Sequence, residues 1–473
     1  MVRLRLLAPI FALLAGACTV GPDYRRPQLR VERAWRAPFP HGARSNRLIG
    51  WWARFDDAVL TTLQARAEQD SPSLDQAVAR IDEARATLAA KRAQNRPSLT
   101  GSASYTRESD QVSVGAASPQ LAESGLQGGS DASWELDLFG KVRHNAQAAK
   151  ARVQARIDDW NDARVSLAAE VGDDYVQYRG CEQLAEVLRE QSESQEATAR
   201  LTRISADAGF QASSDAALAE AAAASVRASY TDQLGQCDLL VKSLVSLTSL
   251  DEPELRKLLQ ARSKILPSPP TLDVESVPAD LVRQRPDVGS SERELAATSA
   301  EIGAAVADLY PSLTLSGSIT AVSGLQQWSI GPSLSLPIFD GGQRRANVRS
   351  ARASYAYQLA AYRKVVRGAI LDVEQALVRL DVARRSEGDA ERAATGYRAT
   401  FVATDQLRRA GGASMLDQET ARRNALDAQE TLISVRVTEI RQWIALYKAL
   451  GGGWDAHVTQ PLARGHLTEE HQP

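Results

Sequence analysis

Four stretches of the chain alternate apolar with small polar residues, each over about ten positions: 98–106, 131–139, 313–320 and 328–336. Alternation with a period of two is typical of β-strands whose two faces meet different surroundings. Because Ser, Thr and Gly fill the second face almost without a break, the pattern predicts transmembrane β-barrel strands, with lipid outside and water inside. Two hairpins that cover a soluble core are the alternative.

The number of strands predicts an oligomer. Open sheet edges are not tolerated in hydrocarbon, because each unpaired backbone group costs several kcal/mol. About eight strands form the smallest membrane barrels, so four cannot close one. Two chains would supply eight strands around an interior filled by side chains, whereas three would supply twelve and leave room for water. The small polar face favours twelve strands and therefore a homotrimer.

The chain also repeats itself. "RPSLTGSASY" from Arg96 matches "YPSLTLSGSI" from Tyr310, and "WELDLFGKVRHNAQ" from Trp134 matches "LSLPIFDGGQRRAN" from Leu334. The two copies lie about 200 residues apart, so we infer an internal two-fold repeat made by duplication. Each copy is predicted to contain a helix, two strands, a long helix, a turn and a second long helix.

Long helical patterns without proline dominate both copies. They span about 65 residues each, which corresponds to roughly 100 Å at 1.5 Å per residue. Gly209 and Gly411 end these helices, and a second helix then returns antiparallel to each. The helical patterns cover residues 58–94, 140–207, 290–309 and 343–409, with the returning helices ending near residues 249 and 450. The predicted fold class is therefore mixed α/β, with helical hairpins and four strands per chain.

The N-terminus is typical of an exported bacterial lipoprotein. Arg3 and Arg5 precede an apolar run of about ten residues, too short to span a bilayer. The following "LAGAC" resembles the lipobox, in which cleavage leaves a lipidated cysteine, here Cys18. Thr19 after it, in place of Asp, favours the outer membrane. An ordinary cleaved signal with an incidental thiol is the alternative.

Neither the composition nor the motifs indicate an enzyme. The net charge of −2 gives no electrostatic case for nucleic acid or for an anionic membrane surface. The sequence lacks the HExxH, GxSxG and P-loop motifs, and its histidines lack metal-ligand spacing. We therefore expect no catalytic residue, no metal and no cofactor. The five histidines are His41, His144, His457, His466 and His471.

Several motifs in order resemble the TolC-like outer-membrane efflux factors, in their lipoprotein or NodT-type branch. They are "CTVGPDYRRP" from Cys18, "WWARFDDAVLTTLQARA" from Trp51, "LVRQRPDVGSSERELAATSAEIGAAVADLYPSLTLSG" from Leu281, "PIFDGG" from Pro337 and "ALYKALGGGW" from Ala445. The resemblance covers nearly the whole mature chain. It implies a homotrimer that shares a 12-stranded barrel, continued into a helical tunnel in the periplasm.

The resemblance also implies a function. Such channels are the exit ducts of tripartite (RND-type) efflux systems, and they dock to a periplasmic adaptor and an inner-membrane pump. We expect passive export of drugs or other small toxic compounds across the outer membrane of a Gram-negative bacterium. A duct for type I protein secretion and a periplasmic scaffold lipoprotein are the alternatives.

The expected organisation follows the repeat. It comprises a signal peptide (1–17), a lipid-anchored segment (18–57), repeat 1 (58–250), a linker or equatorial segment (251–280), repeat 2 (281–450) and a C-terminal tail (451–473).

The remaining cysteines lie at matching heights. Cys181 is 28 residues before Gly209 and Cys237 is 28 after it, so both face each other if Gly209 marks the hairpin turn. A disulfide is expected there in an oxidising periplasm. Two buried free thiols are the alternative.

The resemblance further places a tunnel constriction near the turn of the second hairpin. The family pattern there is Leu-Asp-Ala-Gln-Arg, whereas this chain has Glu-Thr-Ala-Arg-Arg from residue 419. Thr420 thus replaces the expected Asp. We expect Asp417 to supply an acidic ring instead, with Leu416 as an apolar constriction, Arg423 as the basic position and Asp215 as the counterpart in copy one. Solvated side chains that contact an adaptor are the alternative.

Overall fold

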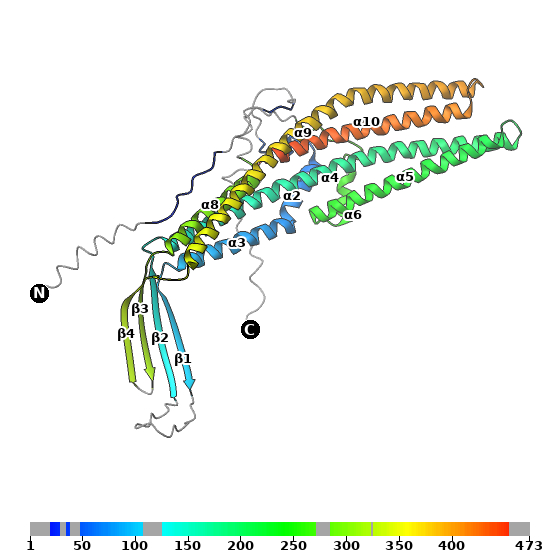
Figure 1. The fold of residues 1–473 in the computed structure, drawn as a ribbon. Helices are drawn as coiled ribbons and strands as arrows, with labels where there is room; N and C mark the ends of the chain where they lie inside the picture. Colours follow the sequence, from blue (N-terminus) through cyan, green and yellow to red (C-terminus); the bar gives the residue numbers. More distant parts are fainter. Residues whose placement is uncertain are drawn as a thin grey trace. The chain divides into compact units, whose positions relative to one another are not determined.

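The computed structural model describes residues 19–28, 35–37, 48–106, 125–270, 284–322 and 325–453. The chain divides into two compact units. The first comprises residues 1–29, 79–158 and 289–364 and contains the sheet (Figure 1). The second comprises residues 30–78, 159–288 and 365–473 and contains the helical hairpins. Among the described residues, no helix combines the length and the apolarity needed to cross a membrane.

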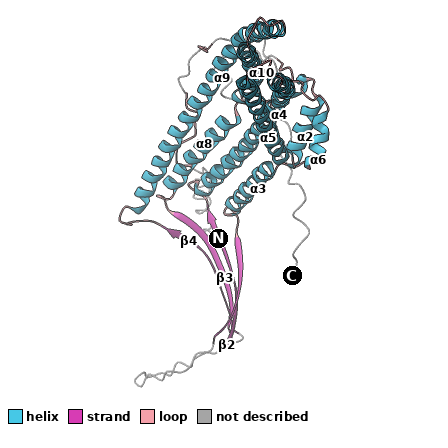
Figure 2. Cartoon of the chain, turned by 90° about the vertical axis from the view of Figure 1, so that its right-hand side faces the viewer, coloured by secondary structure: helices cyan, strands magenta, loops and turns pink. Residues whose placement is uncertain are grey.

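One antiparallel sheet contains all four predicted strands, in the order β1-β2-β3-β4 (Figure 2). The second strand lies earlier than predicted, because it ends before Asp137. That carboxylate accepts hydrogen bonds from the backbone N–H groups of Val142 (3.1 Å) and Arg143 (2.9 Å), which begins the next helix instead. The strands are β1 (Ser98–Thr106), β2 (Gly125–Leu136), β3 (Ser312–Val322) and β4 (Leu325–Ser335).

The strand register separates an apolar from a polar face over the middle of the sheet. One row across the sheet pairs Leu99, Ala132, Gly317 and Ile330, and the adjacent row pairs Thr100, Asp131, Ser318 and Ser329. Side chains of alternate residues point to opposite faces, so the apolar row lies on one face and the polar row on the other. The apolar face is exposed in the single chain; Trp328, for example, is 72% exposed. Strands β1 and β4 are the two unpaired edges.

The long helices have the predicted lengths. Helix α4 (Lys141–Asp207) and helix α9 (Gln343–Arg409) each contain 67 residues, and both predictions are confirmed within one residue. The returning helices are α5 (Ser213–Thr248) and α10 (Met415–Ala449), and each lies beside its partner as a hairpin (Figure 1). Gly209 and Gly411 adopt φ of 78° and 79° in the two turns, a conformation that favours glycine.

The prediction of one helix over residues 58–94 is wrong. The structure has α2 (Ala58–Asp70) and α3 (Pro72–Ala93), separated by Ser71. Pro72 lacks the N–H that a continuous helix needs, and it suits the first turn of a new one. Helix α8 (Pro286–Ala307) likewise begins at a proline.

The second unit has an aromatic core. Trp51 stacks on Tyr447 of α10 with ring centroids 4.7 Å apart, and both are buried. Asp57 begins α2 by accepting hydrogen bonds from Val59 and Leu60, and the Tyr175 hydroxyl donates to it (2.8 Å). The "WWARFDDAVL" motif therefore has a structural role. Two short helices that the sequence did not predict are η1 (Trp52–Phe55) and α6 (Glu252–Gln260).

Arg285 also has a structural role. Its guanidinium donates to the carbonyl oxygen of Ala449 (2.8 Å), at the last turn of α10, and to both carboxylate oxygens of Asp287. The contact holds the segment before α8 against the end of α10, both within the second unit.

Candidate functional site

Asp417 completes the capping box at the start of α10, in which Ser414 is the N-cap residue. Its carboxylate accepts hydrogen bonds from the backbone N–H (3.0 Å) and the hydroxyl (2.6 Å) of Ser414, while the Asp417 N–H donates to Ser414 Oγ (3.1 Å). This reciprocal capping box satisfies backbone donors that would otherwise lack partners. The hydrogen bonds from Ser414 lower the pKa of Asp417, so the carboxylate is ionised at neutral pH. The exposed acid beside the turn is therefore also a fold-forming residue.

Three other sequence-predicted tip residues lie near Asp417 on α10, and the fourth lies on α5. Leu416 is 62% exposed, Thr420 is half-buried and Arg423 is exposed. Asp215 is half-buried in the first turn of α5, where Ala212 occupies the N-cap without a side-chain hydrogen bond. Within the part of the chain that the structure describes, no hydrogen bond or ion pair joins any two of these side chains. Their role in a constriction therefore stays a prediction.

A polar network that the sequence did not predict lies between α4, α9 and α10. Arg422 Nη2 donates to Thr198 Oγ1 on α4 (3.2 Å), and Arg422 Nη1 lies 3.5 Å from Glu419 Oε1. Gln195 on α4 donates to the other oxygen of Glu419. Gln418 donates to Asp405 on α9 (2.5 Å). Residues 418, 419 and 422 therefore connect α10 to both neighbouring helices.

This network is buried and only partly satisfied. The side chains of Arg422 and Glu419 are 6% and 13% exposed. Arg422 Nε and Nη1 and Glu419 Oε1 have no hydrogen-bond partner among the described residues. Burial lowers the pKa of Arg422, which shows that its charge is poorly solvated there. A buried ion pair with unmet hydrogen bonds contributes little net stability, so this junction is a weak point of the second hairpin.

The helical pattern contained a signal for these residues. Met415, Gln418, Ala421, Arg422 and Ala425 are all buried, at the i, i+3, i+4 and i+7 spacing of one helix face. Small and apolar residues at 415, 421 and 425 therefore place Gln418 and Arg422 on the packed face. Arg423, which the family pattern selects, is the neighbour that points outward.

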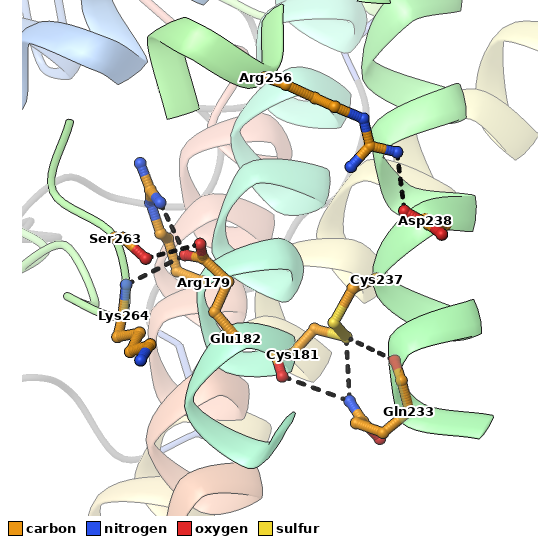
Figure 3. Close-up of a disulfide and its surroundings, with 9 residues drawn as sticks. All are labelled: Arg179, Cys181, Glu182, Gln233, Cys237, Asp238, Arg256, Ser263 and Lys264. Carbon is orange, nitrogen blue, oxygen red and sulfur yellow. Dashed lines mark hydrogen bonds and ion pairs between the residues drawn. A yellow bond between two sulfur atoms is a disulfide. The ribbon is translucent and has the colours of Figure 1, made fainter. Parts of the chain in front are cut away.

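Cys181 and Cys237 form a disulfide between α4 and α5 in the structure (Figure 3). Their Cα atoms are 5.6 Å apart, within the range that a disulfide requires. Gln233 lies beside the bridge and donates to the carbonyl oxygen of Cys181 (3.5 Å). The bridge therefore crosses the hairpin 28 residues from Gly209 on each side, at the height that the sequence spacing predicts.

Polar contacts brace the same level of the hairpin. Arg179, fully buried, donates to Glu182 (2.7 Å) and to the carbonyl oxygen of Leu259 (2.8 Å), and Glu182 accepts from Ser263 (2.9 Å). Arg256 of α6 pairs with Asp238 of α5 (2.7 Å) (Figure 3). The segment after α5 is thus attached to both helices of the hairpin.

Cys18 lies outside the described residues, but the segment that follows it is held in the first unit. The Val20 N–H donates to the carbonyl oxygen of Phe139 (3.3 Å), and its own carbonyl lies 2.8 Å from His144 Nε2 on α4. The hydroxyl of Tyr24 donates to Glu292 of α8 (3.4 Å). Residue 20 is therefore fixed beside the short connection between β2 and α4.

The described part of the chain offers no metal centre, since no group of three or more His, Cys, Asp or Glu side chains could hold an ion. Of the five histidines, only His144 lies within the described residues, and its ring contacts Val20 and Gln147. What the geometry offers instead is a two-faced sheet, long hairpins and a polar junction near one hairpin turn.

A family model for "Outer membrane efflux protein" matches residues 63–249 and 277–452. The chain belongs to the outer membrane efflux protein family. The two matched segments correspond closely to the two halves that each contain a hairpin of strands and a hairpin of long helices.

Relatives of similar length extend the match to nearly the whole chain. Nodulation protein T of Rhizobium leguminosarum bv. viciae is 29% identical and covers 99% of both chains. Outer membrane protein OprJ of Pseudomonas aeruginosa is 30% identical, covering 97% of this chain and 98% of OprJ. The solvent efflux pump outer membrane protein SrpC of Pseudomonas putida is 28% identical over 94% of this chain and 98% of its own.

Solved structures share the fold of this efflux protein. The outer-membrane channel OprN superposes with a TM-score of 0.81 at 30% identity, covering 92% of this chain and all of OprN. The Campylobacter jejuni CmeC outer membrane channel gives a TM-score of 0.81 at 24% identity, covering 93% of this chain and 96% of CmeC.

Proposed function

We propose that this efflux protein is the outer-membrane channel of a tripartite efflux system and exports drugs or other small toxic compounds passively. Relatives named for solvent, toluene and antibiotic efflux pumps support this class of cargo. A periplasmic adaptor and an inner-membrane pump would be its partners, and the chain itself would catalyse no reaction. The observation that carries the proposal is the four-stranded sheet with one apolar face, one polar face and two open edges.

The open edges support a homotrimer. Unpaired edge groups of β1 and β4 would be costly in hydrocarbon, so each edge needs a strand from another chain. Three chains supply twelve strands in a closed barrel. Apolar residues such as Ile330 would then face lipid, whereas Asp131, Ser318 and Ser329 would line a water-filled lumen.

The same proposal includes a lipid anchor on Cys18. Val20 is hydrogen-bonded beside the connection that follows β2, so an anchor two residues earlier in the sequence would lie near the end of the proposed barrel. Acyl chains on Cys18, such as palmitate, would reach the inner leaflet from the periplasmic side. The intact mass of the mature protein measures the added chains. An unmodified Cys18 would argue against this anchor. The proposed boundary between the signal peptide (1–17) and the lipid-anchored segment (18–57) depends on the same cleavage.

Replacing Ile330 by lysine should prevent assembly of the channel in the membrane. A lysine on the lipid face near the middle of a strand costs about 2–4 kcal/mol per chain, and the trimer contains three copies. We expect the wild-type protein to be a heat-modifiable trimer that conducts ions in planar bilayers. The variant should lose both the trimer band and the conductance.

Ser329→Lys is the matched control, since it places the same charge one residue away on the polar face. This variant should still form trimers and conduct. Equal losses in both variants, or a wild-type protein that neither trimerises nor conducts, would contradict the two-faced barrel. A scaffold lipoprotein predicts the second result.

Asp417 and Arg423 are proposed to narrow the tunnel near the α9–α10 turn, with Leu416 and Thr420 beside them and Asp215 on the first hairpin. Threefold rings of charge at a constriction control passage in channels.

Asp417→Ala combined with Arg423→Ala should raise the single-channel conductance roughly twofold or more. Asp389→Ala with Arg392→Ala removes an exposed pair of the same charges from α9 and should leave it unchanged. Unchanged conductance in the first variant would count against the gate.

A further inference from the structure

The first part of α9 carries an unusual excess of positive charge. Residues 343–367 contain seven arginine or lysine residues and no aspartate or glutamate. Arg345, Arg349 and Arg352 are exposed, and none has a hydrogen bond or an ion pair with another described residue. Arg344, by contrast, lies 3.7 Å from both Asp308 and Asp340. Three cations at the start of this helix are therefore not neutralised by any residue that the structure describes.

The spacing places these three side chains on one face. At about 100° per residue, Arg349 and Arg352 lie roughly 40° and 20° to either side of Arg345 around the helix axis. The eight residues from 345 to 352 rise only about 10 Å along the helix. The three guanidinium groups thus form one compact basic patch, here called the α9 patch.

The α9 patch follows directly after an exposed apolar segment. Ile338 and Phe339, between β4 and α9, are 89% and 92% exposed, the highest values among the large apolar side chains of the described residues. Strand β4, with its one apolar face, ends at Ser335. The chain then continues through the apolar connection to the arginines. Side chains at a membrane boundary follow this order, because apolar groups enter the acyl region and cations meet lipid phosphates.

The corresponding part of α4 lacks this feature. Lys141 pairs with Asp308 (2.7 Å), and Arg143 pairs with Asp137 (3.3 Å). These two cations at the start of α4 are thus paired with carboxylates of the same chain. Of these two helix starts, only that of α9 combines exposure, closely spaced charges and an adjoining exposed apolar segment.

We propose that the α9 patch binds the phosphate headgroups of anionic phospholipids in the inner leaflet of the outer membrane. The proposal rests on the barrel proposed above, which puts the end of β4 at the membrane surface. Each arginine donates to phosphate oxygens, while Ile338 and Phe339 insert among the acyl chains. Arginine suits this role because its planar guanidinium donates two parallel hydrogen bonds to a phosphate group.

The test compares bound lipids on purified full-length trimers by native mass spectrometry. The protein is exchanged into mixed micelles with equal amounts of phosphatidylglycerol and phosphatidylcholine. The wild-type protein should retain phosphatidylglycerol preferentially. Arg345→Gln, Arg349→Gln and Arg352→Gln together should lower that preference roughly tenfold or more, since each cation near a membrane adds to anionic lipid binding. High salt should weaken the wild-type preference.

Arg363→Gln, Lys364→Gln and Arg367→Gln form the matched control. They remove three exposed cations from the same helix, about 27 Å farther along it when Arg363 is compared with Arg345. This control should keep the lipid preference.

Three results would overturn the proposal. An unchanged preference in the Arg345/Arg349/Arg352 variant is the first. The second is loss of trimers by this variant in every lipid, which would show that the arginines are subunit contacts instead. The third is that this variant keeps the lipid preference but no longer binds purified peptidoglycan as the wild-type protein does, which would identify that polymer as the partner. If the wild-type protein conducts normally in phosphatidylcholine and the Arg345/Arg349/Arg352 variant keeps the wild-type lipid preference, this inference is rejected and the proposed function stands. If the wild-type protein neither conducts nor binds bilayers, both are rejected.

Discussion

Replacing Cys181 and Cys237 by serine is expected to raise amide hydrogen exchange in α5 by about a thousandfold. The disulfide joins positions 56 residues apart, so it restricts the opened hairpin strongly. The chain-entropy relation gives about 4 kcal/mol for a closed loop of this size. Exchange at buried amides reports the free energy of local opening, and 4 kcal/mol corresponds to about three powers of ten. The largest change should lie in α5 between Gly209 and Cys237.

The second hairpin provides an internal control for this experiment. Positions 202 residues later hold Ala383 and Glu439, so α9 and α10 have no bridge at the matching height. Exchange in α10 should be equal in the wild-type and the double-serine proteins. Thiol titration of the unreduced, denatured wild-type protein should detect neither Cys181 nor Cys237. Two reactive thiols, or equal exchange in α5, would show that the hairpin is not covalently closed in the protein.

The sheet was predictable because its two faces leave a direct trace in the sequence. A period of two defines which residues share a face, and the observed register aligns Leu99, Ala132, Gly317 and Ile330 in one row. The end of β2 was not predictable from alternation alone. Leu138 continues the apolar pattern, but Asp137 before it bonds two backbone N–H groups and starts a helix.

Helix existence was easier to predict than helix interruption. Proline-free stretches of one period gave α4 and α9 almost to the residue. Over residues 58–94, the apolar spacing continues across Pro72 and hides a break that the missing N–H of proline requires. The disulfide height was predictable because the two cysteines are equidistant from Gly209 and both helices rise equally per residue.

The tip network was missed because neighbouring arginines differ only in helical phase. Arg422 and Arg423 lie about 100° apart around the helix axis, so one faces α4 while the other faces solvent. Family resemblance selects Arg423 by sequence position. Arg422 is the residue that packs against the neighbouring helices. Which face of α10 is buried depends on tertiary contacts, which a local sequence pattern does not contain.

Replacing Arg422 by methionine is expected to destabilise the α10 end of the second hairpin by about 3–5 kcal/mol. Methionine is a flexible apolar side chain that can fill much of the space over Phe401, where the guanidinium now lies 5.3 Å from the ring centroid. The loss therefore comes mainly from Glu419, whose buried carboxylate would remain without its cation. Breaking a buried pair by removing one partner is more costly than removing both. Hydrogen exchange at the first turns of α10 measures the change.

The double variant Glu419→Leu with Arg422→Gln separates charge from packing. These are the residues of the family pattern at the two positions, and together they remove both buried charges. We expect its stability to lie within about 1 kcal/mol of the wild-type protein, because the existing pair is only partly hydrogen-bonded. Arg423→Met, at the exposed neighbour, should change the stability by less than about 0.5 kcal/mol.

If the single and double variants at the buried pair lost equal stability, lost packing rather than an unpaired carboxylate would be the cause. If the double variant is as stable as the wild-type protein, the charges at this junction are not retained for stability. The single-channel conductance of the double variant then tests whether the pair affects passage through the channel instead.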